Sequence, residues 1–583
     1  MEANVGRSVQ ARILRALGQY ALMAVLLLVL AVFLLYPIGL TVRGGFARDI
    51  VTGQGWTLEH LALLFKDSVI VEGLLNSAKL ATGTTLLAML IAVPLALIAA
   101  TYKFPGKTFF NAAVLVPLIL PPFVGALGTR AILGREGALN ALLGTDWDVL
   151  GDAKFWGVVV VQALSLYPII YLNATAALAN LDPALGEAAE NLGASWRRRL
   201  LKITLPLVRP GLFAGATIVF IWSFTELGTP LMFDYYSVTP VRIFFGIKEV
   251  EASAEPYALT VVLLAAAVGM YILGKLVFGG KAYAMYSKAS RASGEVELTG
   301  LKGWLAAGAF GLVSLIAVTP HLGVVLMSFT SPGQWYQSVL PKVFTTSHYM
   351  TALTDQDSFG SIRNSLFLAS SAMAFNILLG ILIAYVIVRT TIRGRGLLDA
   401  LCMLPLAVPG LVMAFGYVAM SLSWPFGKGD PLDGVVSVLG ADPNPIPLLI
   451  IAYAIRRLPY IVRSAVAGLE QTSGELEEAA VNLGASRVTA VRKVIVPLIM
   501  ANLIAGGLLV FAFSMLEVSD SLILAQQAKN YPVTRAIFSF TERLGDGPYI
   551  ASAMGVWGMA LLTVTLFAAS VLLGKKLGSI FRV

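Results

Sequence analysis

The chain has 583 residues, of which 57% are hydrophobic and only 13% charged, and its mean hydropathy is +0.80. Water-soluble domains contain about 45–50% apolar and about 25% charged residues, so this composition excludes an ordinary soluble protein. The formal net charge of +9 leaves two explanations open, a nucleic-acid partner or basic residues gathered on one face of a membrane.

Twelve apolar segments are expected to cross a bilayer as helices, which takes about 20 residues each. They cover residues 20–42, 73–101, 108–133, 155–177, 206–230 and 257–279, then residues 303–329, 361–388, 397–423, 446–468, 497–525 and 549–574. The predicted fold class is therefore an all-α integral membrane protein. We expect the first segment to remain as an anchor, because the apolar region of a signal peptide, the alternative, has only about 7–15 residues.

Lysine and arginine are unevenly distributed around these segments. With the N-terminus in the cytoplasm, the cytoplasmic connections carry 23 of these residues and the opposite connections carry 12. Basic residues favour the cytoplasmic face, so both termini are expected in the cytoplasm. Topology thus explains the positive charge, and no nucleic-acid role is predicted.

A polar stretch rich in Ser, Gly and Glu divides the chain near its middle. We expect a first half at residues 1–287, a cytoplasmic linker at 288–302 and a second half at 303–583. Each half then contains six of the twelve predicted spans.

The two halves repeat each other in sequence. Asn76-Ser77 recurs as Asn364-Ser365, 288 residues later, and Pro121 recurs as Pro409 at the same offset. Because six is an even number of spans, both halves have the same orientation. The repeat is therefore parallel, with its pseudo-two-fold axis along the membrane normal and a central pathway between two similar bundles.

The most polar repeated segment follows the fourth span of each half, at residues 178–205 and 469–496. It reads EAAENLGAS at 187–195 and EAAVNLGAS at 478–486, with eight of nine residues identical. Asp182-Pro183, Gly193 and Ser195 predict a short helix, a sharp turn and a second helix.

The second copy repeats these signals and adds Thr472 to Glu475, which reads as a capping box. An interfacial helix that meets anionic lipid through Arg197 to Arg199 is the alternative. Lipid binding requires only charge and an apolar face, however, so the recurrence of uncharged residues favours a protein docking site.

The full pattern is EAA, three residues, Gly, nine residues and Ile-x-Leu-Pro. The first copy has every element, Glu187-Ala188-Ala189, Gly193, Ile203, Leu205 and Pro206, whereas the second has Val494 and Val496 for Ile and Leu. This pattern resembles the signature of permease subunits of binding-protein-dependent ABC importers. A chain with both halves fused is similar to the ferric-iron permeases and also to predicted 2-aminoethylphosphonate permeases.

The resemblance implies the MetI-like type I ABC importer fold, two parallel six-helix repeats, in the inner membrane of a bacterial cell. It implies that the loops are coupling helices seated on two copies of a cytoplasmic ATPase, and that a periplasmic or lipid-anchored binding protein delivers the substrate. ATP and Mg would be bound by the ATPase, and this chain would bind no cofactor. The coupling residues implied are Glu187, Ala188, Ala189, Gly193, Glu478, Ala479, Ala480 and Gly484.

The chain itself shows no phosphate-binding loop. Gly106-Lys107-Thr108 has the ending of G-x-x-x-x-G-K-[ST], but Thr101 stands where the first glycine is required. The three histidines and Cys402 show no metal-ligand spacing, so no metal site is assigned. We therefore predict a permease subunit rather than an enzyme.

Among the ionisable residues within predicted spans, five stand out by their depth or their place in the repeat: Glu226, Glu517, Asp520, Arg456 and Arg457. Charges at membrane depth are costly and face a bundle interior or water. One interpretation is that they pair with one another and fix helix packing, for instance Arg456 with Glu517. The other is that they line the translocation pathway and meet the substrate.

The function predicted is an alternating-access permease of an ATP-driven importer, most specifically for ferric iron. The carboxylates suit a cation, whereas the paired arginines suit an anion such as a phosphonate. An ion-coupled secondary transporter has the same number of spans, but it does not require a repeated helix-turn-helix in one cytoplasmic loop. A membrane enzyme lacks support, because no catalytic constellation stands out.

Overall fold

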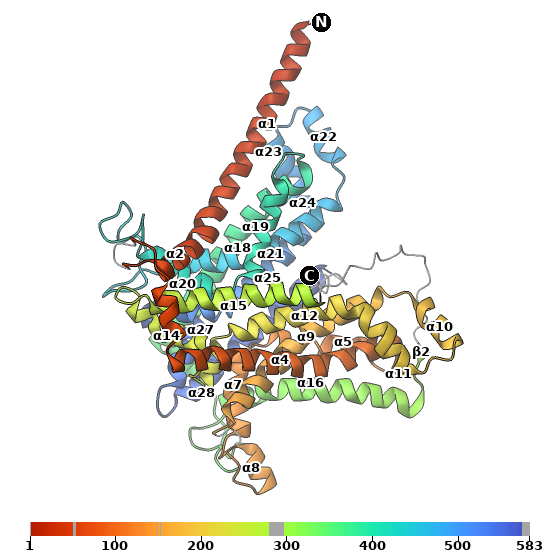
Figure 1. Ribbon diagram of the computed structural model, residues 1–583, viewed down its shortest axis with the longest axis vertical. Helices are drawn as coiled ribbons and strands as arrows, with labels where there is room; N and C mark the ends of the chain where they lie inside the picture. The colour runs from red at the N-terminus through yellow and green to blue at the C-terminus, as the bar shows by residue number, and fades with distance from the viewer. Residues whose placement is uncertain (1, 50–53, 149, 152, 279–295, 574–583) are drawn as a thin grey trace.

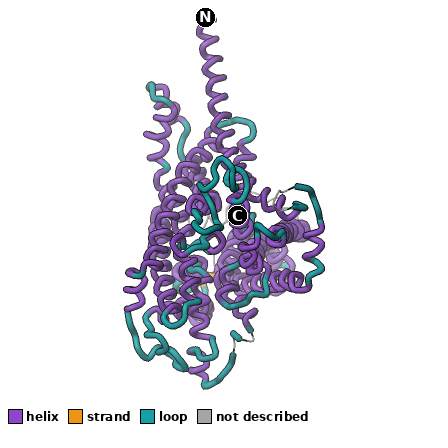
Figure 2. The backbone as a smooth tube through the Cα atoms, turned by 90° about the vertical axis from the view of Figure 1, so that its left-hand side faces the viewer, coloured by secondary structure: helices purple, strands orange, loops and turns teal. Residues whose placement is uncertain are grey.

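The computed structural model describes residues 2–49, 54–148, 150–151, 153–278 and 296–573 (Figure 1). Nearly all of the regular structure in these residues is helical, as Figure 2 shows, so the all-α fold class is confirmed. The strands β1 (Tyr102–Lys103) and β2 (Val296–Glu297) form one short parallel pair. Residues 288–295 of the predicted linker and the predicted cytoplasmic segment 575–583 lie outside the described residues.

The first half contains α1 to α15. Their bounds, with three irregular helical turns, are α1 (Glu2–Leu30), η1 (Ala31–Leu35), α2 (Tyr36–Phe46), α3 (Glu59–Leu64), α4 (Ser68–Thr101), α5 (Lys107–Ala113), α6 (Val116–Ile119), α7 (Pro122–Leu133), α8 (Ala138–Leu143), α9 (Lys154–Ala179), α10 (Pro183–Asn191), α11 (Trp196–Arg199), η2 (Leu200–Thr204), α12 (Leu205–Phe224), α13 (Gly228–Met232), α14 (Thr239–Gly246), η3 (Ile247–Glu249) and α15 (Glu255–Phe278).

The second half contains α16 to α28. Their bounds are α16 (Gly300–Ser328), α17 (Ser347–Thr354), α18 (Gln356–Arg389), α19 (Arg395–Ala407), α20 (Gly410–Ser421), α21 (Ile446–Glu470), α22 (Glu475–Asn482), α23 (Arg487–Ala490), η4 (Val491–Ile495), α24 (Val496–Leu498), α25 (Met500–Met515), α26 (Ser519–Leu524), η5 (Ala528–Asn530), α27 (Val533–Thr541) and α28 (Gly547–Leu573).

Eight helical stretches of the described residues are long and apolar enough to cross a membrane, and three bent pairs raise this number to as many as eleven. The predicted tenth span is not among them. It is α21, a single helix of 25 residues that is more polar than the others because it carries Arg456, Arg457 and Arg463. The exact number of twelve spans therefore stays a prediction.

Three predicted spans are not straight helices, and the eleventh, at 497–525, bends by 75° between α24 and α25. The other two bend beside a proline. The segment at 108–133 bends by 94° between α6 and α7, and the segment at 397–423 bends by 104° between α19 and α20. Pro121 and Pro409 stand at the breaks with extended backbone and precede the next helix. Proline lacks a backbone N–H and disfavours helical backbone in the residue before it, which explains the interruption.

The first span of each half packs against the other half. Helix α2 lies along α20, and the Tyr417 hydroxyl donates a hydrogen bond of 2.7 Å to the carbonyl of Phe33 in η1. Helix α16 lies along α7, where Gly128 is so close to the backbone of Pro320 that a side chain there would overlap it. The two halves thus exchange their first spans.

Figure 1 shows two groups of helices that run in different directions. One group contains α4, α9, α12 and α16, and the other contains α1, α18, α21 and α25. Helix α10 lies near the far end of the first group and α22 near the far end of the second. The groups meet at their other ends, around α14, α20 and α28, so the repeated EAA segments occupy the separated ends of the molecule.

Candidate coupling elbows and central charge cluster

The first EAA segment forms the predicted helix, turn and helix, which we call the first elbow (residues 182–199). The Asp182 carboxylate accepts a hydrogen bond of 2.9 Å from the Ala184 amide at the start of α10. Gly193 follows α10 with φ of +81°, a backbone conformation that glycine adopts without strain. The Ser195 hydroxyl then accepts from the Arg198 amide at 3.4 Å and caps α11.

The second elbow (residues 474–490) repeats this geometry at its turn. Gly484 has φ of +93°, and the Ser486 hydroxyl accepts from the Thr489 amide at 3.2 Å. The predicted capping box from Thr472 to Glu475 is wrong. The N-cap of α22 is Gly474, which has no side chain, and the Ser473 hydroxyl accepts a hydrogen bond of 3.2 Å from the Glu475 amide. The carbonyl and hydroxyl of Thr472 instead accept hydrogen bonds from Arg389.

Both elbows present the same side chains at their tips. Glu187 and Glu478 are exposed, and so are Ala188 and Ala479. Ala189 and Ala480 are half-buried. Each elbow therefore offers a carboxylate beside small side chains, which permits close approach of another surface.

An exposed leucine marks the tip of each elbow. Leu192 is 88% exposed at the end of α10, and Leu483 is 89% exposed at the end of α22. A singly exposed apolar residue is common on proteins, but here the same residue is exposed at equivalent places of two elbows that lie far apart (Figure 1). This equivalence favours an interface with a partner protein.

The arginines of the first elbow are divided between two roles. Arg199 donates a 2.5 Å hydrogen bond to the Glu190 carboxylate and stabilises the elbow internally. Arg197 and Arg198 are exposed, which is compatible with the lipid-facing alternative for this part of the loop.

The second half contains a buried cluster of charges. The Glu517 carboxylate is 4% exposed, lies between α25 and α26, and accepts hydrogen bonds from both Arg456 and Arg457 of α21. Arg456 also lies 3.4 Å from the Asp520 carboxylate, which is fully buried. The expected pairing of Arg456 with Glu517 is thus present in the structure, and it supports the packing interpretation.

The equivalent carboxylate of the first half has a different environment. Glu226 lies between α12 and α13, and its described hydrogen bonds come from the amide and the hydroxyl of Thr229, at 3.3 and 3.4 Å. The residues that correspond to Arg456 and Arg457 are Ser165 and Leu166, neither of which carries a charge. A narrow gap beside Glu226 is too small to hold a water molecule.

The two carboxylate-bearing breaks face each other across the halves. A Cβ atom added at Gly228 would lie 2.8 Å from the Val518 side chain and 2.8 Å from that of Phe123. Glu226 and Glu517 therefore sit on adjoining segments at the centre of the molecule. Contact of these five charges with a substrate stays a prediction.

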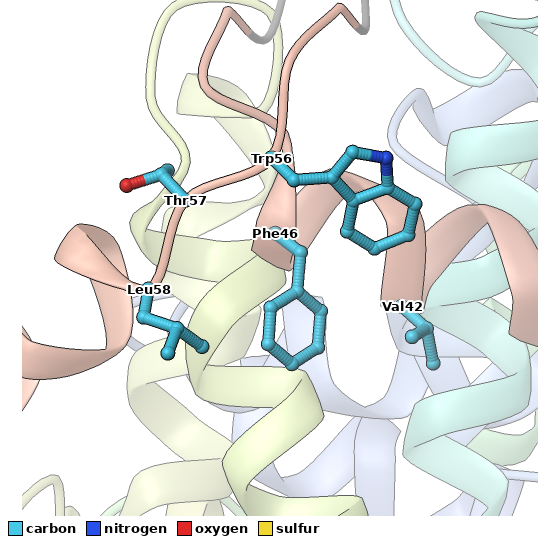
Figure 3. Close-up of a pocket in the computed structure, with 5 residues that line it drawn as sticks. All are labelled: Val42, Phe46, Trp56, Thr57 and Leu58. Atoms are coloured by element: carbon cyan, nitrogen blue, oxygen red, sulfur yellow. The ribbon is translucent and has the colours of Figure 1, made fainter.

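Other candidate features lie apart from this centre. A shallow, mostly apolar pocket at the end of α2 is lined by Val42, Phe46, Trp56, Thr57 and Leu58 (Figure 3). The described histidines each contact a backbone carbonyl, and no group of three or more His, Cys, Asp or Glu among the described residues could hold a metal ion. The Lys107 ammonium donates to the Tyr102 carbonyl at 2.9 Å, within its own loop.

Sequence reasoning missed Arg389, which lies at the end of α18 and binds the turn between α21 and the second elbow. The corresponding residue of the first half is Thr101, but the two halves differ at many positions, so this difference alone did not single out Arg389.

Comparison with known proteins gives a match in each half. Residues 92–283 and 376–577 match the family model described as "Binding-protein-dependent transport system inner membrane component", and together they cover about two thirds of the chain. The ferric transport system permease protein of Actinobacillus pleuropneumoniae is 26% identical over 568 residues, which are 94% of this chain and 77% of that protein.

Two further relatives differ in how much of the chain they match. An Fe(3+)-transport system permease protein of Haemophilus influenzae is 25% identical over 520 residues, 88% of this chain and 91% of that protein. The molybdate/tungstate transport system permease protein of Pyrococcus furiosus is 29% identical over 222 residues, 38% of this chain and 83% of that protein. The relatives with ferric names thus match both halves, whereas this molybdate relative has the length of one.

Proposed function

The chain belongs to the family of binding-protein-dependent transport system inner membrane components, and we propose that it is the fused permease of an ATP-driven importer of ferric iron. It is a multi-pass ABC importer permease in which the family domain occurs twice. The energy source, the cargo and the parts played by single residues are the proposed features.

The pair of equivalent, exposed elbows is the observation that carries the proposal. Each elbow presents Glu187 or Glu478 beside small residues and an exposed leucine, at a separated end of the molecule. Two copies of one ATPase would each receive one elbow in a groove, with ATP and Mg bound in the ATPase. The residues that contact the ATPase would be Glu187, Ala188, Ala189, Gly193, Glu478, Ala479, Ala480 and Gly484.

The mechanism follows from two halves that meet at one end and diverge at the other. ATP binding would draw the two ATPases together, and the elbows would move with them. The units at 1–287 and 303–583 would then rock against each other and open the pathway to the outside. A binding protein would release its cargo there, and both termini would remain in the cytoplasm of a bacterial cell.

Ferric iron is supported by two observations. The relatives with ferric names are similar to this chain over both halves. At the centre, Arg456 and Arg457 are hydrogen-bonded to Glu517, whereas the hydrogen bonds described for Glu226 come from Thr229 and the charge of Arg456 acts on it only without such a bond. A carboxylate of this kind favours a cation in transit.

A small anion is the second candidate cargo. The molybdate relative and the two arginines favour an oxyanion or a phosphonate such as 2-aminoethylphosphonate. For such a cargo, at least one arginine must leave Glu517 while the anion passes. An ion-coupled secondary transporter is the alternative from a different class of transport protein.

Reconstitution in liposomes with the co-purified ATPase and the binding protein tests the proposal. We expect uptake of labelled ferric iron that requires both ATP and the ATPase, and that falls at least tenfold for the elbow double variant Glu187→Ala/Glu478→Ala, since each 1.4 kcal/mol of lost contact is about a factor of ten. Uptake by the chain alone under a proton gradient would support the secondary transporter. Uptake of molybdate or a phosphonate in place of iron would assign an anion as cargo.

A further inference from the structure

The second elbow is held to its own half by an arginine that the first half lacks. Arg389 is the last residue of α18, and its Nη2 donates to the Leu469 carbonyl at 3.2 Å. The same nitrogen donates to the carbonyl and the hydroxyl of Thr472, each at 2.8 Å. These acceptors lie where α21 ends and the chain turns toward α22.

This contact adds a charged donor at a helix end. The Leu469 carbonyl already accepts hydrogen bonds from the amide and the hydroxyl of Thr472, at 3.2 and 3.0 Å, and Arg389 joins the Thr472 carbonyl to the same point through one nitrogen. Hydrogen bonds from charged donors are stronger than those from neutral donors. Arg389 therefore fixes the direction in which the second elbow leaves α21.

A second contact from α18 reaches the elbow helix itself. The Tyr385 hydroxyl, one turn before Arg389, donates a hydrogen bond of 2.7 Å to the Glu477 carboxylate in α22. Glu477 is only 8% exposed, although it lies beside the exposed Glu478. The face of α22 opposite the docking surface is thus attached to α18.

The first half has none of these groups. Leu97, Thr101 and Gly186 stand at the positions of Tyr385, Arg389 and Glu477. The ion pair described in the first elbow, Arg199 with Glu190, lies within the elbow and does not reach α4.

We propose that Tyr385 and Arg389 are positioning residues that make the second elbow a rigid extension of α18 and α21, whereas the first elbow moves more freely on its half. This inference rests on the proposed ATP-driven function. The two elbows would then transmit movement of the ATPases unequally, and the second elbow would carry most of it.

Hydrogen–deuterium exchange of the full-length permease tests the attachment without any ATPase. In the unmodified protein we expect the amides of α22 to exchange about tenfold more slowly than those of α10, in line with the strength of charge-assisted hydrogen bonds. Arg389→Ala should remove this difference, and Tyr385→Phe, which deletes only one hydroxyl, should reduce it. Thr101→Ala, the matched change in the first half, should leave it intact.

The coupling role is tested in the reconstituted importer, by counting ATP molecules hydrolysed per cargo molecule delivered. We expect this ratio to rise about threefold or more for Arg389→Ala and to stay unchanged for Thr101→Ala. Equal exchange of α10 and α22 in the unmodified protein would overturn the attachment. Altered exchange with an unchanged ratio would overturn the coupling role, whereas transport without any ATPase would instead overturn the proposed function.

Discussion

Glu517 lies almost fully buried because two guanidinium groups from α21 bind its carboxylate. Removing one member of a buried ion pair leaves the other charge without compensation and costs about 3–5 kcal/mol. The free energy of unfolding therefore depends on the ion pair rather than on either residue alone.

A double-mutant cycle measures this dependence. Arg456→Ala and Glu517→Ala should each destabilise the protein by roughly 3 kcal/mol, and the double variant should lose at least about 1 kcal/mol less than their sum. The measurement is the free energy of unfolding in detergent. Glu226→Gln is the control and should cost less, since the hydrogen bonds described for Glu226 come from an amide and a hydroxyl rather than from a guanidinium group. Strict additivity would contradict the pairing.

The sequence predicted charges inside spans but could not choose between their roles. Arg456 and Glu517 are 61 residues apart, and their contact depends on how α21 and α25 are rotated about their axes. Apolar residues surround both helices, so no hydropathy pattern specifies that rotation. The different environment of Glu226 was visible in the sequence only as the uncharged pair Ser165 and Leu166.

Among the elements, local signals predicted the elbows well. Asp182, Gly193 and Ser195 act within three residues of where they stand, so the sequence sufficed for the helix, the turn and the second cap. The predicted capping box at Thr472 does not form. The carbonyl and hydroxyl of Thr472 instead accept hydrogen bonds from a distant residue, Arg389.

The presence of a proline does not by itself predict that a span bends. Pro121 and Pro409 break their segments, yet Pro94 and Pro459 lie inside continuous helices. The apolar composition continues through each break, so hydropathy reports one span where the structure has two helices. Neighbouring helices decide whether the freed backbone groups are satisfied.

Close packing of α7 against α16 gives a prediction for glycine. A Cβ atom at Gly128 would overlap the Pro320 carbonyl and lie 3.0 Å from the Gly323 carbonyl carbon. Gly128→Ala should therefore destabilise the protein by about 1–3 kcal/mol, measured as unfolding in detergent. Gly308→Ala, in the same α16, meets no atom within 4 Å and should be neutral or stabilising by about 0.5–1 kcal/mol. Equal effects would contradict this packing.

At the scale of the whole molecule, the two elbows are expected on one side of the membrane. Asn191→Cys and Asn482→Cys place thiols at equivalent exposed positions, while the native Cys402 is buried. A membrane-impermeant reagent should label both thiols in inside-out vesicles and neither in intact cells, because the basic connections favour the cytoplasm. Thr346→Cys, exposed in a connection predicted on the other side, should show the reverse. Labelling of the two elbows from opposite sides would contradict the parallel repeat.

The sequence did not predict that the two halves exchange their first spans. Repeated halves have similar apolar faces, so α2 matches its own half about as well as the other half on hydropathy alone. Only the fit of particular residues, such as Tyr417 against the Phe33 carbonyl, distinguishes the two arrangements.

This exchange has a consequence for biosynthesis. About 360 residues separate Phe46 at the end of α2 from Gly410 at the start of α20, and a ribosome adds about 5–20 residues per second. The nascent α2 must therefore wait tens of seconds in the bilayer for its partner, with lipid tails covering the face that α20 will occupy. In a polypeptide terminated after the first half, that face would never meet α20, and we expect cellular proteases to remove such a chain.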